Sequence, residues 1–187
     1  MPHIVFNNDA FTNSQIESKI WLCKELEKLN WVSDTTHIYG GWYATTAFLL
    51  FSRGIFKVNH IESFDLDPSC EDIANMINEN WKFQKRFGAF TEDCSKPIAP
   101  LKGNCDLIIN TASEHFHTMD WFNNLPKGMR VIIQGNNMIH DDEHTVHTES
   151  LESFINYYPL SEYNYTGTMD FAYPNFSFTR YMMIGTK

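Results

Sequence analysis

Residues 35–54, TTHIYGGWYATTAFLLFSRG, contain a strand-like run, a pair of glycines and an apolar run in immediate succession. Thr35–Tyr39 is rich in β-branched and aromatic residues and ends at the glycines, which is typical of a short strand. The apolar residues of Trp42–Phe51 come next, and Gly54 closes them in the manner of a helix C-cap. The segment therefore predicts a strand, a glycine turn and a helix.

The following segment repeats this order of elements. His60–Asp65 predicts a second strand. The helix after it is expected to begin at Pro68, because Asp67 can cap it and proline suits the first turn. This helix is expected to continue through Ile77. Strands that alternate with helices favour a parallel sheet.

The rest of the chain supplies further strands and helices. Strands are expected at Gly88–Thr91, Cys105–Asn110, Met129–Gln134, Glu162–Phe171 and Phe178–Ile184. The last two alternate enough to pair as an antiparallel edge. Helices are expected from the S-x-x-E capping box at Ser14–Glu17 onward and over Leu151–Tyr157, and Thr118–Asn124 has room for only a short helix. The pattern predicts an α/β fold: a three-layer α/β/α sandwich with a mostly parallel, Rossmann-like sheet and an antiparallel last strand.

Length and composition fit one folded domain. The 187 residues are expected to form a single domain, 1–187, in which residues 1–34 are a helical lead.

Acidic residues outnumber lysine and arginine, 23 against 14, and the net charge of −9 disfavours binding to a nucleic acid. The longest apolar run, Ala47–Phe51, is too short for a membrane span, and no secretion signal is recognisable, so we expect a cytoplasmic protein. The four cysteines form no C-x-x-C pair and are expected to be reduced thiols.

Ligands of such a sheet are expected beyond the carboxyl ends of its strands. Gly40 and Gly41 follow the first strand, where backbone amides could approach a ligand, although such a pair is also an ordinary turn. Asp65 ends the second strand, 24 residues after Gly41, and an acidic residue at this place can accept both hydroxyls of a ribose. Asp93 follows the third strand and could receive the amino group of an adenine or be a solvated loop acid.

The segment after the fourth strand gathers several polar groups. Asn110–His115 brings an amide, two hydroxyls, a carboxylate and an imidazole together directly after a buried run. Functional side chains concentrate in loops that a rigid scaffold holds in place. We therefore favour a functional role over loop packing for this segment.

Taken in order, these motifs resemble those of the class I S-adenosylmethionine-dependent methyltransferases. Ile38–Tyr43 stands in the place of the glycine motif, Phe64–Pro68 is similar to the acidic motif, and Asp106–His115 is similar to the motif after the fourth strand. Phe178–Gly185 resembles the antiparallel last strand of that family. The glycine motif departs from the family pattern, because Tyr39 precedes the glycines where an acidic residue is usual.

The resemblance implies the cofactor S-adenosylmethionine, held by Gly40, Gly41, Asp65, Asp93 and Asn110. Because this cofactor has no phosphate, it suits a shorter glycine turn than a dinucleotide does. Methyl transfer needs the sulfonium methyl held in line with a nucleophile, and any proton on that nucleophile must be accepted. Glu114 and His115 are the candidate proton acceptors, and Asn110 would orient the substrate or the methionine end of the cofactor.

A last polar cluster, residues 134–147, follows the fifth strand and contains four possible metal ligands, His140, Asp141, His144 and His147. The histidines at 140 and 144 would share a helix face and suggest a metal site, but no apolar helix surrounds them. A polar loop with solvated or substrate-facing side chains is therefore favoured over a metal site. The expected substrate contacts are Gln134, Asn136 and His140.

Three functions compete on these grounds. A methyltransferase that acts on a small molecule or a small exposed group is favoured, since no separate recognition domain is recognisable. The alternative is a non-catalytic Rossmann-like module that binds a nucleoside or serves in an assembly. A nicotinamide-dependent enzyme is disfavoured because the chain lacks a full G-x-G-x-x-G motif. The methyl acceptor and the oligomeric state stay open.

Overall fold

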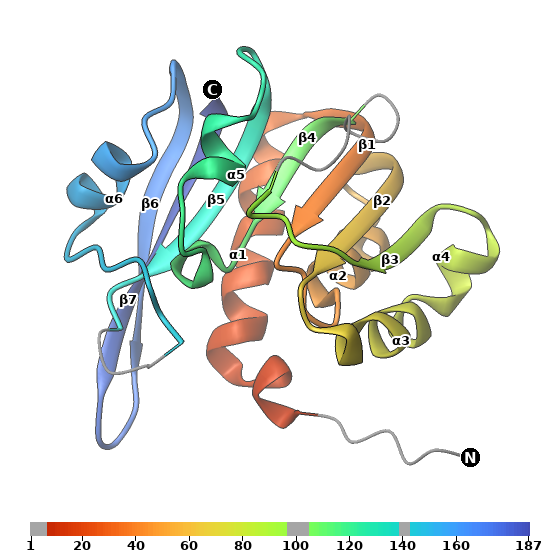
Figure 1. Cartoon of the computed structure of the whole chain (residues 1–187), viewed down its shortest axis with the longest axis horizontal. Helices are drawn as coiled ribbons and strands as arrows, with labels where there is room; N and C mark the ends of the chain where they lie inside the picture. Colours follow the sequence, from red (N-terminus) through yellow and green to blue (C-terminus); the bar gives the residue numbers. More distant parts are fainter. Residues whose placement is uncertain (1–6, 97–104, 139–142) are drawn as a thin grey trace.

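The computed structural model describes residues 7–96, 105–138 and 143–187, whose strands form one seven-stranded sheet (Figure 1). The strand order is β3-β2-β1-β4-β5-β7-β6. Strands β1 to β5 are parallel to their neighbours, and β7 runs antiparallel to both β5 and β6. The strands are β1 (Val32–Tyr39), β2 (Lys57–Asp65), β3 (Phe87–Thr91), β4 (Cys105–Asn110), β5 (Arg130–Asn136), β6 (Glu162–Ala172) and β7 (Ser177–Thr186). The predicted mostly parallel sheet with an antiparallel last strand is confirmed.

Helices cover both faces of this sheet, which confirms the predicted three-layer sandwich (Figure 1). Helices α1, α2 and α3 pack on one face, and α5 and α6 pack on the other. The helices are η1 (Asn8–Phe11), α1 (Asn13–Leu29), α2 (Thr45–Arg53), α3 (Pro68–Ile77), α4 (Glu79–Phe83), η2 (Ser113–His115), α5 (Asp120–Asn123) and α6 (Leu151–Tyr157). Among the described residues, none of these helices has the length and apolar character needed to cross a membrane.

Neighbouring residues of the central strands contribute to different halves of the core. Ile109 of β4 and Ile132 of β5 pack under α1 and α2. Ile108 and Val131, one position earlier in each strand, pack under α5 and α6. All four side chains are fully buried. This two-sided burial explains why both strands are continuous apolar runs in the sequence.

The strand order reverses at β1, and this reversal fixes the position of the site. From β1 the chain moves outward through β2 to β3 and then returns to β4 on the other side of β1. The register places Tyr39 level with Phe64 on one side and with Asn110 on the other. The loops that leave β1 and β4 therefore diverge at the carboxyl edge, where open α/β sheets bind their ligands.

The cap of α3 forms as predicted, whereas that of α1 does not. Oδ1 of Asp67 accepts a hydrogen bond from the backbone N–H of Ser69 at 2.9 Å, and a proline occupies the first turn. The predicted capping box at Ser14–Glu17 is wrong, because α1 begins directly after Thr12, which makes no side-chain capping hydrogen bond. The serine of the predicted box lies inside the helix and is buried.

Local backbone conformation also shifts the start of α2. The helix was expected from Trp42 but begins at Thr45, because Trp42 and Ala44 have left-handed φ angles of 50° and 53°. Gly54 ends the helix in the left-handed conformation, as predicted. Strands β1 and β2 each begin three residues before the predicted position.

Candidate functional site

The glycine turn and Asp65 meet at the carboxyl ends of β1 and β2. Gly40 has a left-handed φ of 61°, and the backbone N–H of Gly41 donates to the carbonyl of Phe64 at 2.9 Å. The backbone N–H of Trp42 donates to Oδ2 of Asp65 at 2.7 Å. The two motifs that the sequence separates by a helix and a strand are therefore one structural unit.

Both glycines lie close to neighbouring side chains, and the contact is much closer at Gly41 than at Gly40. A Cβ atom on Gly41 would lie 2.0 Å from Oγ of Ser63, closer than any real contact. A Cβ atom on Gly40 would lie 3.2 Å from the ring of Phe116. The sequence pattern had suggested that Gly41 serves a ligand or the turn, and the structure adds close contact with β2 as a further reason. Contact of either glycine with a cofactor stays a prediction.

Asp65 presents a partly buried carboxylate at this edge. Its Oδ1 accepts a hydrogen bond from the backbone N–H of Asp67 at 3.1 Å. Burial raises the pKa of Asp65 above its usual value, although the hydrogen bonds from Asp67 and Trp42 act in the opposite direction. A carboxylate oxygen can accept more than one hydrogen bond, so both oxygens keep capacity for hydroxyl donors of a ligand.

Asn110 ends β4 on the other side of β1 and is fully buried. Its Oδ1 accepts a hydrogen bond from the backbone N–H of Ala112 at 3.0 Å. Its Nδ2 has no hydrogen-bond partner among the described residues. Buried amide groups are normally satisfied, so these two N–H donors are suited to a ligand at the strand ends.

Asp93 folds back on its own loop after β3. Its Oδ1 accepts hydrogen bonds from the backbone N–H and the hydroxyl of Ser95, and its Oδ2 forms an ion pair with Lys96 at 2.8 Å. The contacts with Lys96 and Ser95 lower the pKa of Asp93. These bonds fit the alternative of a solvated loop acid as well as a ligand contact, so the contact with adenine stays a prediction.

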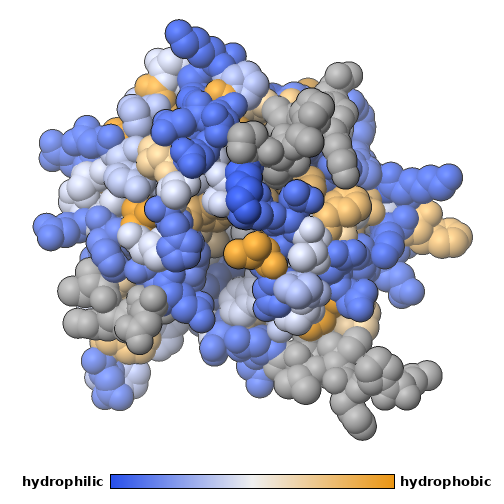
Figure 2. Space-filling view, in the orientation of Figure 1, coloured by the Kyte–Doolittle hydropathy of each residue, from blue (hydrophilic) through white to orange (hydrophobic). Residues whose placement is uncertain are grey.

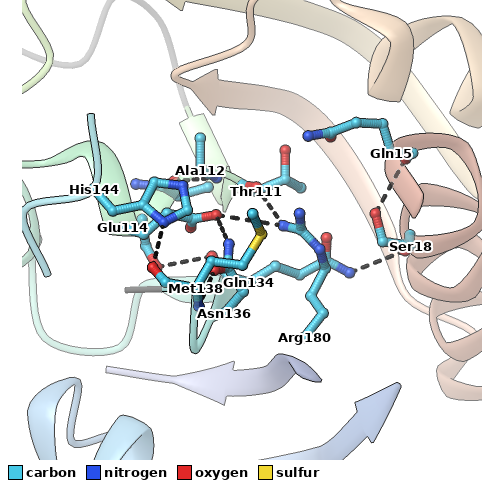
Figure 3. Close-up of polar contacts among 12 residues, drawn as sticks. Gln15, Ser18, Thr111, Ala112, Glu114, Gln134, Asn136, Met138, His144 and Arg180 are labelled. Atoms are coloured by element: carbon cyan, nitrogen blue, oxygen red, sulfur yellow. Dashed lines mark hydrogen bonds and ion pairs between the residues drawn. The ribbon is translucent and has the colours of Figure 1, made fainter. Parts of the chain in front are cut away.

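A cluster of buried charged and amide side chains lies beside these strand ends (Figure 3). Nδ2 of Asn136 donates to Oε1 of Glu114, and Nη1 of Arg180 lies 3.6 Å from the same oxygen. Arg180 also donates to the carbonyl of Thr111 at 3.4 Å. Glu114 and Arg180 are only 4% and 3% exposed. The sequence prediction had included Glu114 and Asn136 but not Arg180.

Helix α1, at the right of Figure 3, extends this cluster through Ser18 and Gln15. Nε2 of Gln134 donates to the carbonyl of Ser18 at 3.0 Å. Nζ of Lys19 donates to the side chain of Gln15 at 2.7 Å. Burial and the charge of Arg180 lower the pKa of Lys19 to about 7, although Glu114 acts in the opposite direction. Gln134 thus joins β5 to α1, and its predicted contact with a substrate stays a prediction.

Two histidines adjoin Glu114. His115 is exposed, and its ring meets that of His144 edge to face with centroids 4.7 Å apart. Nδ1 of His144 lies 2.9 Å from the carbonyl oxygen of Met138. His140, the third predicted substrate contact, lies outside the described residues.

Arg180 and Lys19 were not predicted as site residues, although the sequence contains a feature by which each could be recognised. Arg180 is the single charge within the apolar strand segment Phe178–Ile184. Lys19 stands three residues after Ile16 and four before Cys23, at the helical spacing of the apolar stripe of α1. A charged residue at an apolar position of a helix or strand is the sign by which both could be recognised.

The molecular surface is hollowed near the centre of the face shown in Figure 2, in the region where the strand ends lie in Figure 1.

Neither a protein-family model nor a curated protein matches the sequence. Solved structures do match, and the chain is similar to the N-methyltransferase NodS from Bradyrhizobium japonicum, crystallised with S-adenosylhomocysteine. The TM-score is 0.68 at 10% identity, over 93% of this chain and 88% of that one.

Two further structures agree with this likeness. Geranyl diphosphate C-methyltransferase from Streptomyces coelicolor, also with S-adenosylhomocysteine, has a TM-score of 0.65 at 13% identity over 92% of this chain and 76% of that one. A putative sarcosine dimethylglycine methyltransferase from Galdieria sulphuraria has a TM-score of 0.66 at 12% identity, over 97% of this chain and 91% of that one. This chain has the methyltransferase fold.

In this methyltransferase fold, the candidate residues form two neighbouring groups. The first group lies at the ends of β1, β2 and β4 and consists of Gly40, Gly41, Asp65 and Asn110. The second group lies between η2, β5, β7 and α1 and consists of Glu114, Gln134, Asn136, Arg180 and Lys19. The predicted position of Gly40, Gly41, Asp65 and Asn110 at strand ends is confirmed, whereas their contact with a cofactor stays a prediction. The second group is brought together by strand pairing.

Proposed function

We propose that this chain transfers a methyl group from S-adenosylmethionine to a small acceptor molecule. The main support is the arrangement at the carboxyl edge of the sheet, where the strand order reverses at β1. The glycine turn and Asp65 lie there, together with Asn110, whose Nδ2 has no hydrogen-bond partner among the described residues. The likeness to methyltransferases crystallised with S-adenosylhomocysteine supports the same assignment.

The first group of residues would hold the cofactor. Asp65 would accept the ribose hydroxyls, and the backbone amides around Gly40 and Gly41 would meet the methionine end. Asn110 would donate through its Nδ2 to a carbonyl or carboxylate oxygen. Asp93 would accept the adenine amino group at Oδ2, which contacts Lys96 and keeps capacity for a second donor.

The second group would face the acceptor. Gln134, Asn136 and Arg180 are polar and buried, so a small polar molecule suits them better than a macromolecule. Glu114 and His115 would assist the departure of the proton from the acceptor as the methyl group arrives. The sulfonium sulfur keeps the electron pair of the broken carbon–sulfur bond, so the protein itself needs no covalent step.

A thermal-shift series tests this proposal against its rivals. S-adenosylmethionine and S-adenosylhomocysteine should raise the melting temperature, because a ligand at about 100 times its dissociation constant stabilises a fold by about 2.7 kcal/mol. NAD should leave it unchanged. Stabilisation by NAD alone would favour the nicotinamide enzyme instead.

Single-turnover assays with a panel of small amines, hydroxyls and carboxylates then separate an enzyme from a binding module. Formation of S-adenosylhomocysteine with any acceptor supports the proposal. Tight cofactor binding without turnover on the whole panel would favour the non-catalytic nucleoside-binding module.

A further inference from the structure

Three possible metal ligands meet where η2 packs against the segment after β5. Within the described residues, Glu114, His115 and His144 each offer one ligand atom, and these atoms all lie within 4.8 Å of one another. The sequence predicted no metal, because no apolar helix surrounds the histidines of residues 134–147. We propose that Glu114, His115 and His144 bind a divalent transition-metal ion such as Zn²⁺.

The carboxylate of Glu114 is oriented for a further partner (Figure 3). Its Oε1 accepts from Asn136 and lies near Arg180, which fixes the side chain. Its Oε2 is buried and has no hydrogen-bond partner among the described residues. A buried carboxylate oxygen without a partner is costly, and a cation is the partner that would relieve most of this cost.

His144 carries the outer hydrogen bond that is typical of metal-binding histidines. A carbonyl can only accept, so Nδ1 of His144 donates its proton to the oxygen of Met138 at 2.9 Å. In the neutral ring the lone pair is then on Nε2, the nitrogen that would bind the ion. Such a bond to a backbone carbonyl fixes both the tautomer and the ring orientation.

The backbone holds the two segments together. The carbonyl of Glu114 accepts hydrogen bonds from the backbone N–H groups of Thr145 and Val146 at 2.8 and 3.0 Å. These bonds keep η2 beside His144, although η2 follows β4 and His144 lies in the segment after β5. The ligand set is therefore supported by the fold and does not depend on side-chain positions alone.

Access and distance are also compatible with an ion. His115 is exposed, so an ion can enter from solvent and displace water. Bonds of about 2.0–2.2 Å to nitrogen and oxygen place tetrahedral ligand atoms about 3.5 Å apart. Because the three ligand atoms lie within 4.8 Å of one another, shifts of roughly an ångström among these side chains would bring them to this separation.

The ligand types select the class of ion. Two imidazoles and one carboxylate suit Zn²⁺ and related first-row ions and leave at least one position open. Mg²⁺ prefers oxygen ligands and is expected to bind poorly. Binding of the ion is independent of the proposed methyl transfer. Only its use rests on that function: with Glu114 and His115 bound to the ion instead of acting as proton acceptors themselves, an acceptor hydroxyl at the open position would lose its proton to solvent more easily.

Calorimetric titration of the metal-stripped chain with ZnCl₂ tests the site. We expect one ion per chain, with an affinity that falls at least about 10-fold in His115→Asn, His144→Asn and Glu114→Gln. His117→Asn and His147→Asn are matched controls, because both histidines are exposed neighbours outside the cluster, and they should bind Zn²⁺ like the wild type. MgCl₂ should give no comparable binding.

His115→Asn is the decisive variant, because its exposed side chain can be replaced without loss of the fold. Unchanged Zn²⁺ affinity in this variant, or an equal loss in either control, would overturn the proposed site. S-adenosylhomocysteine binding is measured on the same samples. Retained cofactor binding without Zn²⁺ binding would refute the metal site alone, and the reverse result would refute the proposed function alone.

Discussion

Asp65 combines two tasks, since it closes the glycine turn and presents oxygens to the strand ends. Asp65→Ala is expected to weaken S-adenosylhomocysteine binding by about 1.5–3 kcal/mol, the range for a hydrogen bond to a charged group. Isothermal calorimetry measures this loss. Asp67→Ala is the matched control, because it removes the cap of α3 and should cost about 1 kcal/mol of stability without changing affinity. Equal affinity in wild type and Asp65→Ala would remove Asp65 from the site.

Gly41 makes a packing contact that can be tested by a double-mutant cycle. Gly41→Ala places its Cβ against Oγ of Ser63 and is expected to cost about 1–3 kcal/mol of stability. Ser63→Ala removes that oxygen, so the double variant should recover part of the loss. Urea denaturation gives the four free energies of unfolding. If the two costs simply add, the contact with Ser63 is not the reason for the glycine.

Helix α1 places Lys19 in the buried cluster, where Arg180 and Glu114 act on it with opposite sign. The pKa of Lys19 falls from 10.5 to about 7 on folding, so the unfolded chain binds more protons between these pH values. Stability therefore rises with pH across this window, and the full cost of the buried charge remains below about pH 7.

Lys19→Met is expected to abolish this dependence. The variant should be more stable than the wild type near pH 7, and the difference should shrink as the pH approaches 10. Urea denaturation at both ends of the window measures it, with Lys24→Met, an exposed position of the same helix, as the control. Parallel pH profiles of wild type and Lys19→Met would show that Lys19 keeps its proton in the folded protein.

The charge of the whole molecule bears on the class of partner. A net charge of −9 should repel a polyanion at long range. Fluorescence anisotropy with a short labelled RNA is expected to show no binding at about 0.15 M salt, where only close charge contacts survive screening. Binding that persists at this ionic strength would contradict the prediction and point to a local basic cleft.

Much of the fold follows from local pattern. β4 and α6 have the predicted boundaries, Cys105–Asn110 and Leu151–Tyr157. A continuous apolar run between polar residues and a short amphipathic segment are each compatible with few other secondary structures. The start of α3 could be predicted because the side chain of Asp67 caps the helix and the fixed φ angle of the proline after it suits the first turn. The positions of the glycine turn, Asp65 and Asn110 after strands were likewise enough to place them at one edge of the sheet, because parallel strands align their carboxyl ends. That β1 lies between β2 and β4 follows from the strand order alone.

Tertiary structure alone decided how the second group of residues assembles. Gln134 and Ser18 are 116 residues apart in the sequence, and Arg180 and Thr111 are 69 apart. Arg180 reaches Glu114 because β7 inserts between β5 and β6 and pairs Arg180 with Asn136. A side chain carries no local mark of the residue that it will meet across a sheet, since that contact depends on strand order and register rather than on nearby sequence.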